Sequence, residues 1–196
     1  PGIIDVPDNV IENIDYALEK GLEPLLILDY GHPAYDQGLA PHSKEGIEAY
    51  VRYVRTVVSQ LRGRVKYFEV WNEPNLDRFW TPESNPKAYA RLLKAAGSAI
   101  REENPEAVVL GGAVSEIDLE FLEVVFEEGA YDSLDVVSVH PYFYPDDPEN
   151  KDLPGQLEDL TQLCQKYGPA KPIWISEVGV PTHEGGGASA QRQADM

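Results

Sequence analysis

The chain has 196 residues, of which 42% are hydrophobic and 26% are charged, a composition typical of one globular domain with a sizeable core. Its 34 acidic and 16 basic residues give a formal net charge of −18, which would repel nucleic acid and anionic lipid, so we expect neither as a partner. The single cysteine, Cys164, excludes an intramolecular disulfide and a cysteine-based metal site, and no run of residues is apolar and long enough to span a membrane.

Patterns typical of helices alternate along the chain with short apolar runs typical of buried strands. The helical patterns cover residues 7–20, 43–61, 85–104, 118–128 and 155–167, and one more helix is expected from residue 190. Ser43 and Asp118 are suited to cap two of these helices, and Asn85-Pro86 opens a third. The strand-like runs cover residues 24–30, 65–71, 107–110, 135–140 and 172–178.

This alternation predicts an α/β fold in which helices cover a parallel sheet. An open doubly wound sheet and a (β/α)8 TIM barrel both fit the pattern. Nucleotide-binding doubly wound folds carry a glycine-rich phosphate fingerprint after a strand, and Gly111-Gly112-Ala113 and the loop Gly185-Gly186-Gly187 lack its spacing. A complete barrel needs about 250 residues, so the five strands would form only part of one.

Polar residues gather at the C-terminal ends of the predicted strands, where a parallel barrel collects its catalytic groups. Strand by strand, they are Asp29, Tyr30 and His32; Asn72 and Glu73; Ser115 and Glu116; His140 and Tyr142; and Ser176 and Glu177. In a barrel all these strand ends ring one mouth, so residues that are remote in sequence would converge there.

Glu73 and Glu177 stand at the ends of hydrophobic strands that each carry a tryptophan. Aromatic walls favour the neutral form of a carboxyl group, which a general acid needs, and a second carboxylate close by can act as a nucleophile. Such a pair about 5 Å apart hydrolyses glycosides with retention of configuration, and a pair about 6.5 to 9.5 Å apart inverts it. One glutamate at a strand end could simply satisfy a loop amide, but two in matched positions favour catalysis.

Other uses of these residues stay open from the pattern alone. His140 could be a hydrogen-bonded core residue, and a metal site is the rival use of the cluster, although the chain has no His-x-His pair and no His-Glu-x-x-His helix. Trp80, with Phe79, could pack in the interior or offer a platform on which a sugar stacks. Trp174 is a further candidate for contact with the substrate, although its pattern fits the core better.

Four motifs stand in order along the chain: Trp71-Asn72-Glu73-Pro74-Asn75, Val109-Leu110-Gly111-Gly112, Ser138-Val139-His140-Pro141-Tyr142 and Trp174-Ile175-Ser176-Glu177-Val178-Gly179. With these motifs the chain resembles clan A glycoside hydrolases, and most of all glycoside hydrolase family 39, which includes β-xylosidase-like and bacterial endo-acting enzymes. The resemblance spans nearly the whole chain. Glycoside hydrolase families 5 and 53 share parts of the pattern.

The resemblance implies a partial (β/α)8 barrel, about strands three to seven with their helices, so that residues 1–196 would be a single catalytic domain truncated at both ends. It implies a retaining glycosidase that cleaves an oligo- or polysaccharide without a metal or cofactor, with Glu73 as acid/base and Glu177 as nucleophile. The positions that match further residues of the family are Asn72 for the sugar 2-hydroxyl, His140 and Tyr142 for orienting the nucleophile and lining the subsite, and Asp29, Tyr30 and His32 for substrate contact.

An open five-strand sheet would expose two apolar edges, through which copies of the chain could associate. Two other functions stay open, a non-catalytic carbohydrate-binding barrel fragment and an unrelated metal-dependent TIM-barrel hydrolase. Labelling by a fluorinated activated glycoside would separate an enzyme from a mere binder, and loss of activity on chelation would identify the metal enzyme. Relatives that act on polysaccharides are often exported, and the compartment of this chain stays open.

Overall fold

The computed structural model describes residues 4–146, 148–183 and 187–195, and in this part the chain forms a parallel sheet of five strands. The strands are β1 (Leu25–Leu28), β2 (Tyr67–Val70), β3 (Val108–Ser115), β4 (Val136–His140) and β5 (Ile173–Ile175). They lie side by side in chain order, and every neighbouring pair is parallel. Because a doubly wound sheet reverses its strand order at a switch point, the unbroken order identifies part of a (β/α)8 barrel.

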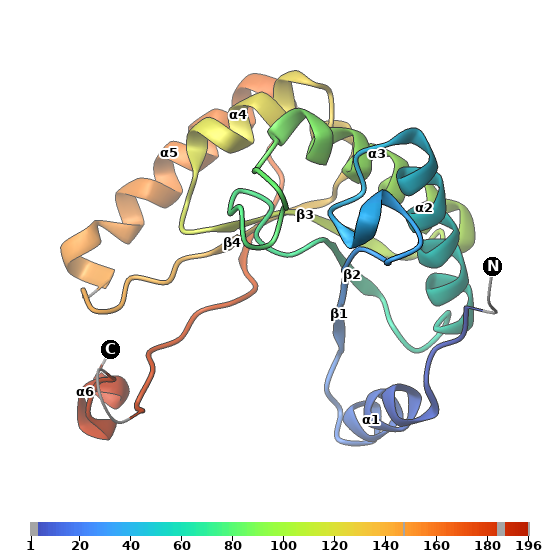
Figure 1. Ribbon diagram of the computed structural model, residues 1–196. Coiled ribbons are helices and arrows are strands. Elements are labelled where there is room, and N and C mark those ends of the chain that lie inside the picture. Colours follow the sequence, from blue (N-terminus) through green and yellow to red (C-terminus); the bar gives the residue numbers. More distant parts are fainter. Residues whose placement is uncertain (1–3, 147, 184–186, 196) are drawn as a thin grey trace.

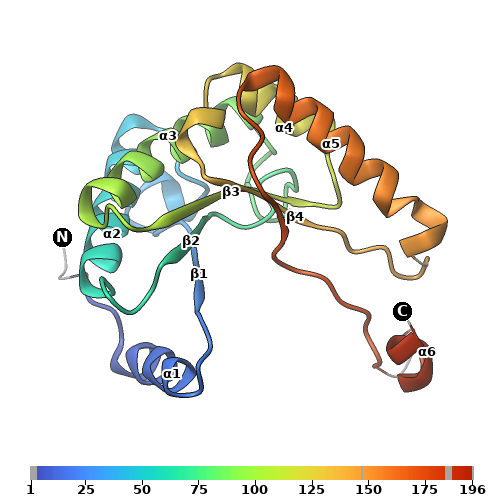
Figure 2. The same ribbon diagram turned by 180° about the vertical axis from the view of Figure 1, so that it is seen from behind.

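Helices alternate with the strands along the chain, and most of them cover the outer face of the curved sheet. They are α1 (Asp8–Glu19), α2 (Lys44–Gln60), α3 (Pro86–Glu103), α4 (Leu119–Glu127), α5 (Leu153–Tyr167) and α6 (Ala190–Asp195), with 3₁₀ turns η1 (Asp36–Gly38), η2 (Tyr131–Ser133) and η3 (Pro148–Lys151). Helices α2 to α5 form a row along the sheet, and α6 lies away from this row at the end of an extended segment (Figures 1 and 2). No helix in the described ranges is both long enough and apolar enough to cross a membrane.

The predicted parallel sheet and its alternation with helices are confirmed, but β3 is longer than predicted. The run predicted to end at Leu110 continues through Gly111 and Gly112 to Ser115. The register with β4 shifts between Gly112 and Val114, and Gly112 has a φ of +105°, which glycine adopts without a steric penalty. The strand therefore continues past the two glycines through a bulge at Ala113, the residue without a register partner in β4.

Two further expectations differ from the structure at the C-terminal side. Strand β5 covers three residues, Ile173–Ile175, and so is shorter than the predicted run over residues 172–178. The N–H of Ser176 still donates to the carbonyl oxygen of Val139 on β4 at 3.3 Å, and the register between β4 and β5 ends at Ile175. Gly185 and Gly186 of the predicted glycine loop lie outside the described residues.

The hydrophobic core fills the space between the sheet and the row of helices. Fully buried members come from both layers and include Val54, Leu92, Leu93, Val109 and Leu122. The helices begin where the sequence places a cap, since the side chains of Ser43, Asn85 and Asp118 each accept a hydrogen bond from a backbone N–H of the first turn. Cys164 is buried in the same core, as its place on an apolar stripe predicts.

Two buried tyrosines of the helix layer satisfy backbone groups of the strands. The hydroxyl of Tyr50, on α2, donates to the carbonyl oxygen of Leu28. The hydroxyl of Tyr89, on α3, donates to the carbonyl oxygen of Val70 at 3.0 Å and accepts from the N–H of Gly112 at 3.0 Å. Tyr89 thus joins the end of β2 to Gly112 inside β3, and β2 is the strand that leads to Glu73.

We expect Tyr89→Phe to lower the free energy of unfolding by about 2 kcal/mol, because the substitution leaves a buried backbone acceptor and a buried backbone donor without their partner. Urea denaturation measures this difference. Tyr16→Phe is the matched control: Tyr16 is 62% exposed on α1, and its change should stay within about 0.5 kcal/mol. Equal effects of the two substitutions would contradict this account of Tyr89.

Candidate active site

The backbone turns sharply where β2 ends, and this turn places Glu73. Trp71 has a φ of +67° and Glu73 a φ of +42°, a left-handed conformation that costs energy in residues other than glycine and recurs at functional sites. The N–H of Glu73 donates to the carbonyl oxygen of Ala113 at 2.9 Å, and the indole N–H of Trp71 donates to the carbonyl oxygen of Phe79 at 3.0 Å. As a result the side chain of Glu73 is 4% exposed at the C-terminal end of the sheet.

The side chain of Asn75 ties the loop after Glu73 to the end of β3. Its oxygen accepts from the N–H of Ser115 at 2.9 Å, and its amide nitrogen donates to the carbonyl oxygen of Ser115 at 3.1 Å. The same nitrogen donates to Asp118, the cap of α4, at 3.2 Å. Asn75 therefore continues the hydrogen bonding of the sheet beyond the last residue of β2 and fixes the position from which Glu73 projects.

The imidazole of His140, at the end of β4, lies among three carboxylates. Its Nδ1 is 3.5 Å from Glu73 Oε1 and 3.8 Å from Glu177 Oε2, and its Nε2 is 3.7 Å from Glu69 Oε1. His140 and Glu69 are both fully buried. Among the described residues, neither ring nitrogen of His140 forms a hydrogen bond of good geometry. One histidine therefore faces the two predicted catalytic glutamates on one side and a third glutamate on the other.

The charges around His140 decide its protonation. Burial lowers the pKa of His140, but the carboxylates of Glu69, Glu177 and Glu73 outweigh burial and raise that pKa above its ordinary value. Tyr142, on the loop after β4, donates from its hydroxyl to Glu177 Oε2 at 3.0 Å. Burial and this contact with Glu177 raise the pKa of Tyr142 to about 12, so that its hydroxyl keeps its proton and acts as a donor.

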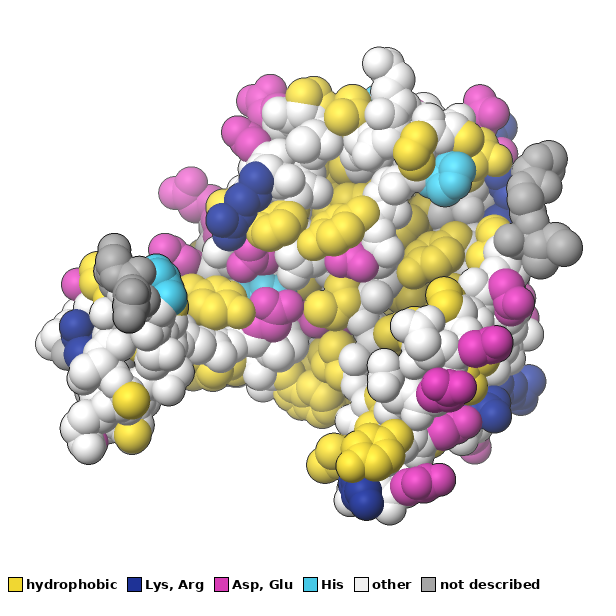
Figure 3. Space-filling view, turned by 60° about the horizontal axis from the view of Figure 1, so that its bottom comes forward, with side chains coloured by type: hydrophobic (Ala, Val, Ile, Leu, Met, Phe, Trp, Pro, Cys, Tyr) yellow, Lys and Arg dark blue, Asp and Glu magenta, His cyan; other side chains and the backbone are white. Residues whose placement is uncertain are grey.

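An aromatic and amide rim borders the carboxylates. The ring of Tyr30, which is 51% exposed, stacks on the ring of Phe79 with 6.2 Å between centroids and 4° between planes. The Asn72 side chain donates to the Tyr30 hydroxyl at 3.2 Å. Arg78 lies over Phe79 and also reaches Glu73 Oε2 at 3.2 Å. On the hollow face of the molecule, Figure 3 shows acidic side chains set among hydrophobic ones.

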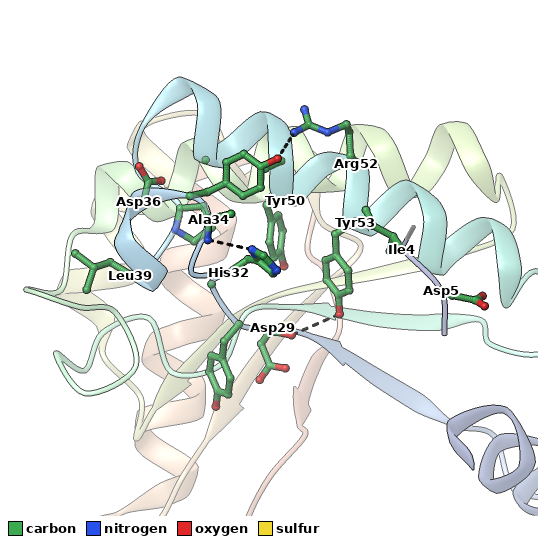
Figure 4. Close-up of a pocket in the computed structure, with 16 residues that line it drawn as sticks. Ile4, Asp5, Asp29, His32, Ala34, Asp36, Leu39, Tyr50, Arg52 and Tyr53 are labelled. Carbon is green, nitrogen blue, oxygen red and sulfur yellow. Dashed lines mark hydrogen bonds between the residues drawn. The ribbon is translucent and has the colours of Figure 1, made fainter. Parts of the chain in front are cut away.

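The remaining predicted contacts, Asp29 and His32, line a pocket of about 730 Å³ between β1 and α2, beside the carboxylate cluster (Figure 4). His32 is exposed there and accepts from the N–H of Ala34. Burial, partly opposed by Tyr30, raises the pKa of Asp29, and the charge of Glu177 raises it further. Tyr53, which the pattern assigns to the core, is half-buried and lines this pocket.

Two tryptophans, Trp80 and Trp174, are predicted to contact the substrate. The structure corrects this prediction for Trp80 and places Trp174 apart from the glutamates. Trp80 is 2% exposed, because Trp71 and Tyr89 pack against it edge to face, so it has no free ring face on which a sugar could stack. Trp174 is 36% exposed and packs against Tyr67, with 5.1 Å between ring centroids, below the strand ends that carry the glutamates. Exposed ring surface beside Glu73 comes instead from Tyr30.

Three contributors to this cluster, Glu69, Arg78 and Ser176, are absent from the predicted site residues. The signal for Glu69 is present in the sequence, because it is the one acid inside the apolar run Phe68-Glu69-Val70, where a charge needs a partner. Arg78 lies on a loop, and no pattern in the sequence directs it to Glu73. In the described part of the chain, no group of three or more His, Cys, Asp or Glu side chains has a geometry that could hold a metal ion.

Comparisons with known proteins give one consistent result. Residues 44–152 match the sequence profile of glycosyl hydrolases family 39. A β-xylosidase of Caldicellulosiruptor saccharolyticus is 31% identical over 153 residues, which are 68% of this chain and 30% of that protein. A family 39 glycoside hydrolase of the gut symbiont Bacteroides cellulosilyticus WH2 superposes with a TM-score of 0.82 at 20% identity, covering 98% of this chain and 42% of that one.

A monomeric β-xylosidase of Caulobacter crescentus CB15 superposes with a TM-score of 0.70 at 24% identity, over 88% of this chain and 40% of that one. At these identities the superpositions establish the shared fold alone. The chain thus spans less than half the length of each of these relatives.

The raised pKa of His140 predicts how stability depends on pH. Because the pKa is raised in the folded chain above the ordinary 6.5, protonation of His140 stabilises the fold. This contribution is fully present below pH 6.5 and is lost as the pH rises through the raised pKa. Relative to His140→Gln, the free energy of unfolding of the wild-type chain should therefore fall across that interval, as urea denaturation between about pH 6 and 9 would show.

His32→Gln is the control for this measurement, because His32 is exposed. Its pH dependence should follow that of the wild type. A His140→Gln curve parallel to the wild-type curve at every pH would contradict the electrostatic role of the carboxylates around His140.

Proposed function

The chain belongs to glycosyl hydrolases family 39, and on this premise we propose that the protein hydrolyses O-glycosidic bonds of an oligo- or polysaccharide with retention of configuration. We take residues 1–196 as part of a single catalytic domain. Because curated relatives of the chain are β-xylosidases, a β-xyloside is the first substrate to test.

The proposed reaction is a double displacement. The carboxylate of Glu177 attacks the anomeric carbon while Glu73 gives its proton to the leaving glycosidic oxygen, so the bond to that oxygen breaks and a glycosyl-enzyme ester forms. Glu73, now a carboxylate, then takes a proton from water. The resulting hydroxide attacks the anomeric carbon and releases Glu177, which restores both groups.

The observation that carries this proposal is that both carboxylates face one imidazole nitrogen. Since Glu73 Oε1 and Glu177 Oε2 each lie within 3.8 Å of His140 Nδ1, they can be no farther apart than twice that distance. A retaining pair is about 5 Å apart, and an inverting pair is about 6.5 to 9.5 Å apart. This upper limit on the distance between the two oxygens excludes the largest separations of an inverting pair and is compatible with the separation of a retaining pair.

The surrounding residues support recognition of a sugar next to the pair. Asn72 and Tyr30 are bonded to each other beside Glu73, where an amide can meet the sugar 2-hydroxyl and an exposed ring can meet its C–H face. Tyr142 holds the proposed nucleophile by its hydroxyl. We further propose that Asp29 and His32, which line the pocket between β1 and α2, contact the substrate on that side. Trp174 is the proposed contact that lies farthest from the glutamate pair.

The proposal predicts covalent trapping at Glu177. A 2-deoxy-2-fluoro xyloside with an activated leaving group should add one fluoro-sugar to the wild-type chain, because the fluorine slows both steps while the activated leaving group speeds up only the first, so the glycosyl-enzyme accumulates. Intact mass and peptide mapping locate the adduct. Glu177→Gln should take no label, whereas Glu73→Gln should still take it and should lose about 10² to 10⁴-fold in release of the sugar.

A chain that binds xylo-oligosaccharide but takes no label would be a binding fragment. Label on another residue would overturn the assignment of the nucleophile. Glu116→Gln is the matched control, because Glu116 is an exposed acid at the end of β3.

We further propose that copies of the chain associate through the edge formed by β5. Trp174 and Ile175 of β5 are 36% and 42% exposed, Val178 beyond the strand is 64% exposed, and an edge strand offers unpaired backbone groups to a partner. Sedimentation velocity at rising concentration should show a dimer. Ile175→Lys should weaken it by placing a charge at the edge, and Leu22→Lys, at a position 61% exposed beside α1, should not. A wild-type chain that stays monomeric at every concentration would contradict the proposed association.

A further inference from the structure

Glu69 is a buried acid that the proposed reaction does not use. It lies on β2 and is fully buried. Its Oε1 accepts from the hydroxyl of Ser176 at 2.8 Å, and its Oε2 has no partner among the described residues. Since β2 and β5 are not neighbours in the sheet, the bond to Ser176 crosses the concave face of the barrel fragment. A glutamate removed from water in this way stays a carboxylate only where a positive charge lies nearby, and otherwise it takes up a proton.

The basic group that meets this requirement is His140. The 3.7 Å contact between Glu69 Oε1 and His140 Nε2 joins two side chains that are both 0% exposed. Arg78, the other cation at the cluster, contacts Glu73 and not Glu69, and its side chain is 68% exposed. A neutral histidine carries a proton on one nitrogen, whereas the imidazolium carries a proton on both. Only the imidazolium can therefore present an N–H to Glu69 and to the glutamate pair at once.

We propose that Glu69 is a positioning residue that keeps His140 as an imidazolium, with Nε2–H toward Glu69 and Nδ1–H toward Glu73 and Glu177. Glu69 acts through His140 and does not touch the sugar. A fixed positive charge beside the pair favours the ionised form of Glu177, the proposed nucleophile, and of Glu73 once it has given up its proton. It also holds the oxygens of both glutamates on one side of the imidazole. This role in positioning rests on the proposed glycosidase function, whereas the charge state of His140 does not.

Among the described residues, the charged or titratable groups around His140 come from several strands and the loops that follow them. Strand β2 and its loop bring Glu69 and Glu73, the segment after β5 brings Glu177, and the loop after β4 brings Tyr142. At the end of β3, Glu116 bonds to His140 through its backbone N–H, and its side chain is exposed. Of these acids only Glu69 is fully buried and lacks a contact with another cation, so its charge depends most on the histidine.

The test is a nuclear magnetic resonance titration of the whole chain labelled with ¹⁵N-histidine. The four histidines are few enough for their ring nitrogens to be followed separately, and the signals absent from His140→Gln assign His140. In the wild type both ring nitrogens of His140 should have the shifts of an imidazolium at pH 7. Glu69→Gln, which keeps the shape and the oxygen that accepts from Ser176, should lower the titration midpoint of His140 by roughly one pH unit or more.

Two controls separate charge from structure. Glu116→Gln removes an exposed acid near the same strand end and should leave the midpoint unchanged. Ser176→Ala removes the hydroxyl bonded to Glu69 but keeps the charge, so it should move the midpoint less than Glu69→Gln does. Glu69→Asp keeps the charge at a shorter reach and should restore part of the shift.

A neutral His140 at pH 7 in the wild type would overturn the inference, even if no Glu69 variant folded. An unchanged midpoint in folded Glu69→Gln would overturn it as well. If the chain releases xylose from an aryl β-xyloside, Glu69→Gln should lower kcat more than it raises KM, since Glu69 does not contact the sugar. Failure of covalent labelling at Glu177 would refute the glycosidase proposal and leave the titration result intact, so the two failures are distinguishable.

Discussion

Burial of several negative charges around one imidazole is the constraint on which the rest of this structure depends. Glu69, Glu73 and Glu177 all lie within 4 Å of the ring nitrogens of His140, and the first two are almost completely removed from water. Such a cluster is costly in isolation, so the chain must hold it by backbone geometry. The parallel order of the strands provides this, because it directs the ends of β2, β4 and β5 to the same rim of the sheet.

The rim itself is rigid because side chains complete the hydrogen bonding that the strands leave open. Tyr89 joins the end of β2 to Gly112 inside β3 from the helix layer, and Asn75 extends the pairing of β3 beyond the turn that carries Glu73. The left-handed conformation of Trp71 and Glu73 is therefore held from both sides. In this arrangement the helices, the strands and the Glu73 side chain form one connected unit, and the exposed ring of Tyr30 lies at its border.

Sequence patterns predict the repeating architecture and the main residues of the site, because both depend on periodicity and on position relative to a strand end. Glu73, His140 and Glu177 converge as the barrel hypothesis requires. What the patterns miss depends on three-dimensional neighbours. The extension of β3 needs a bulge partner in β4, the burial of Trp80 needs the rings of Trp71 and Tyr89, and the contact of Arg78 with Glu73 depends on the path of a loop. Glu69 is the exception, since an acid inside an apolar strand is visible in the sequence.

The strand order also has a consequence for how firmly each catalytic group is held. Among the described residues each strand pairs only with its neighbours in the chain. There β5 pairs with β4 alone, over three residues, whereas β2 lies between β1 and β3. Local opening of β5 breaks fewer contacts than opening of β2, so the two glutamates belong to cooperative units of unequal stability. Fraying at the last strand releases Glu177 while Glu73 stays in place. Amide exchange in such a chain would therefore be protected around Glu73 and fast around Glu177.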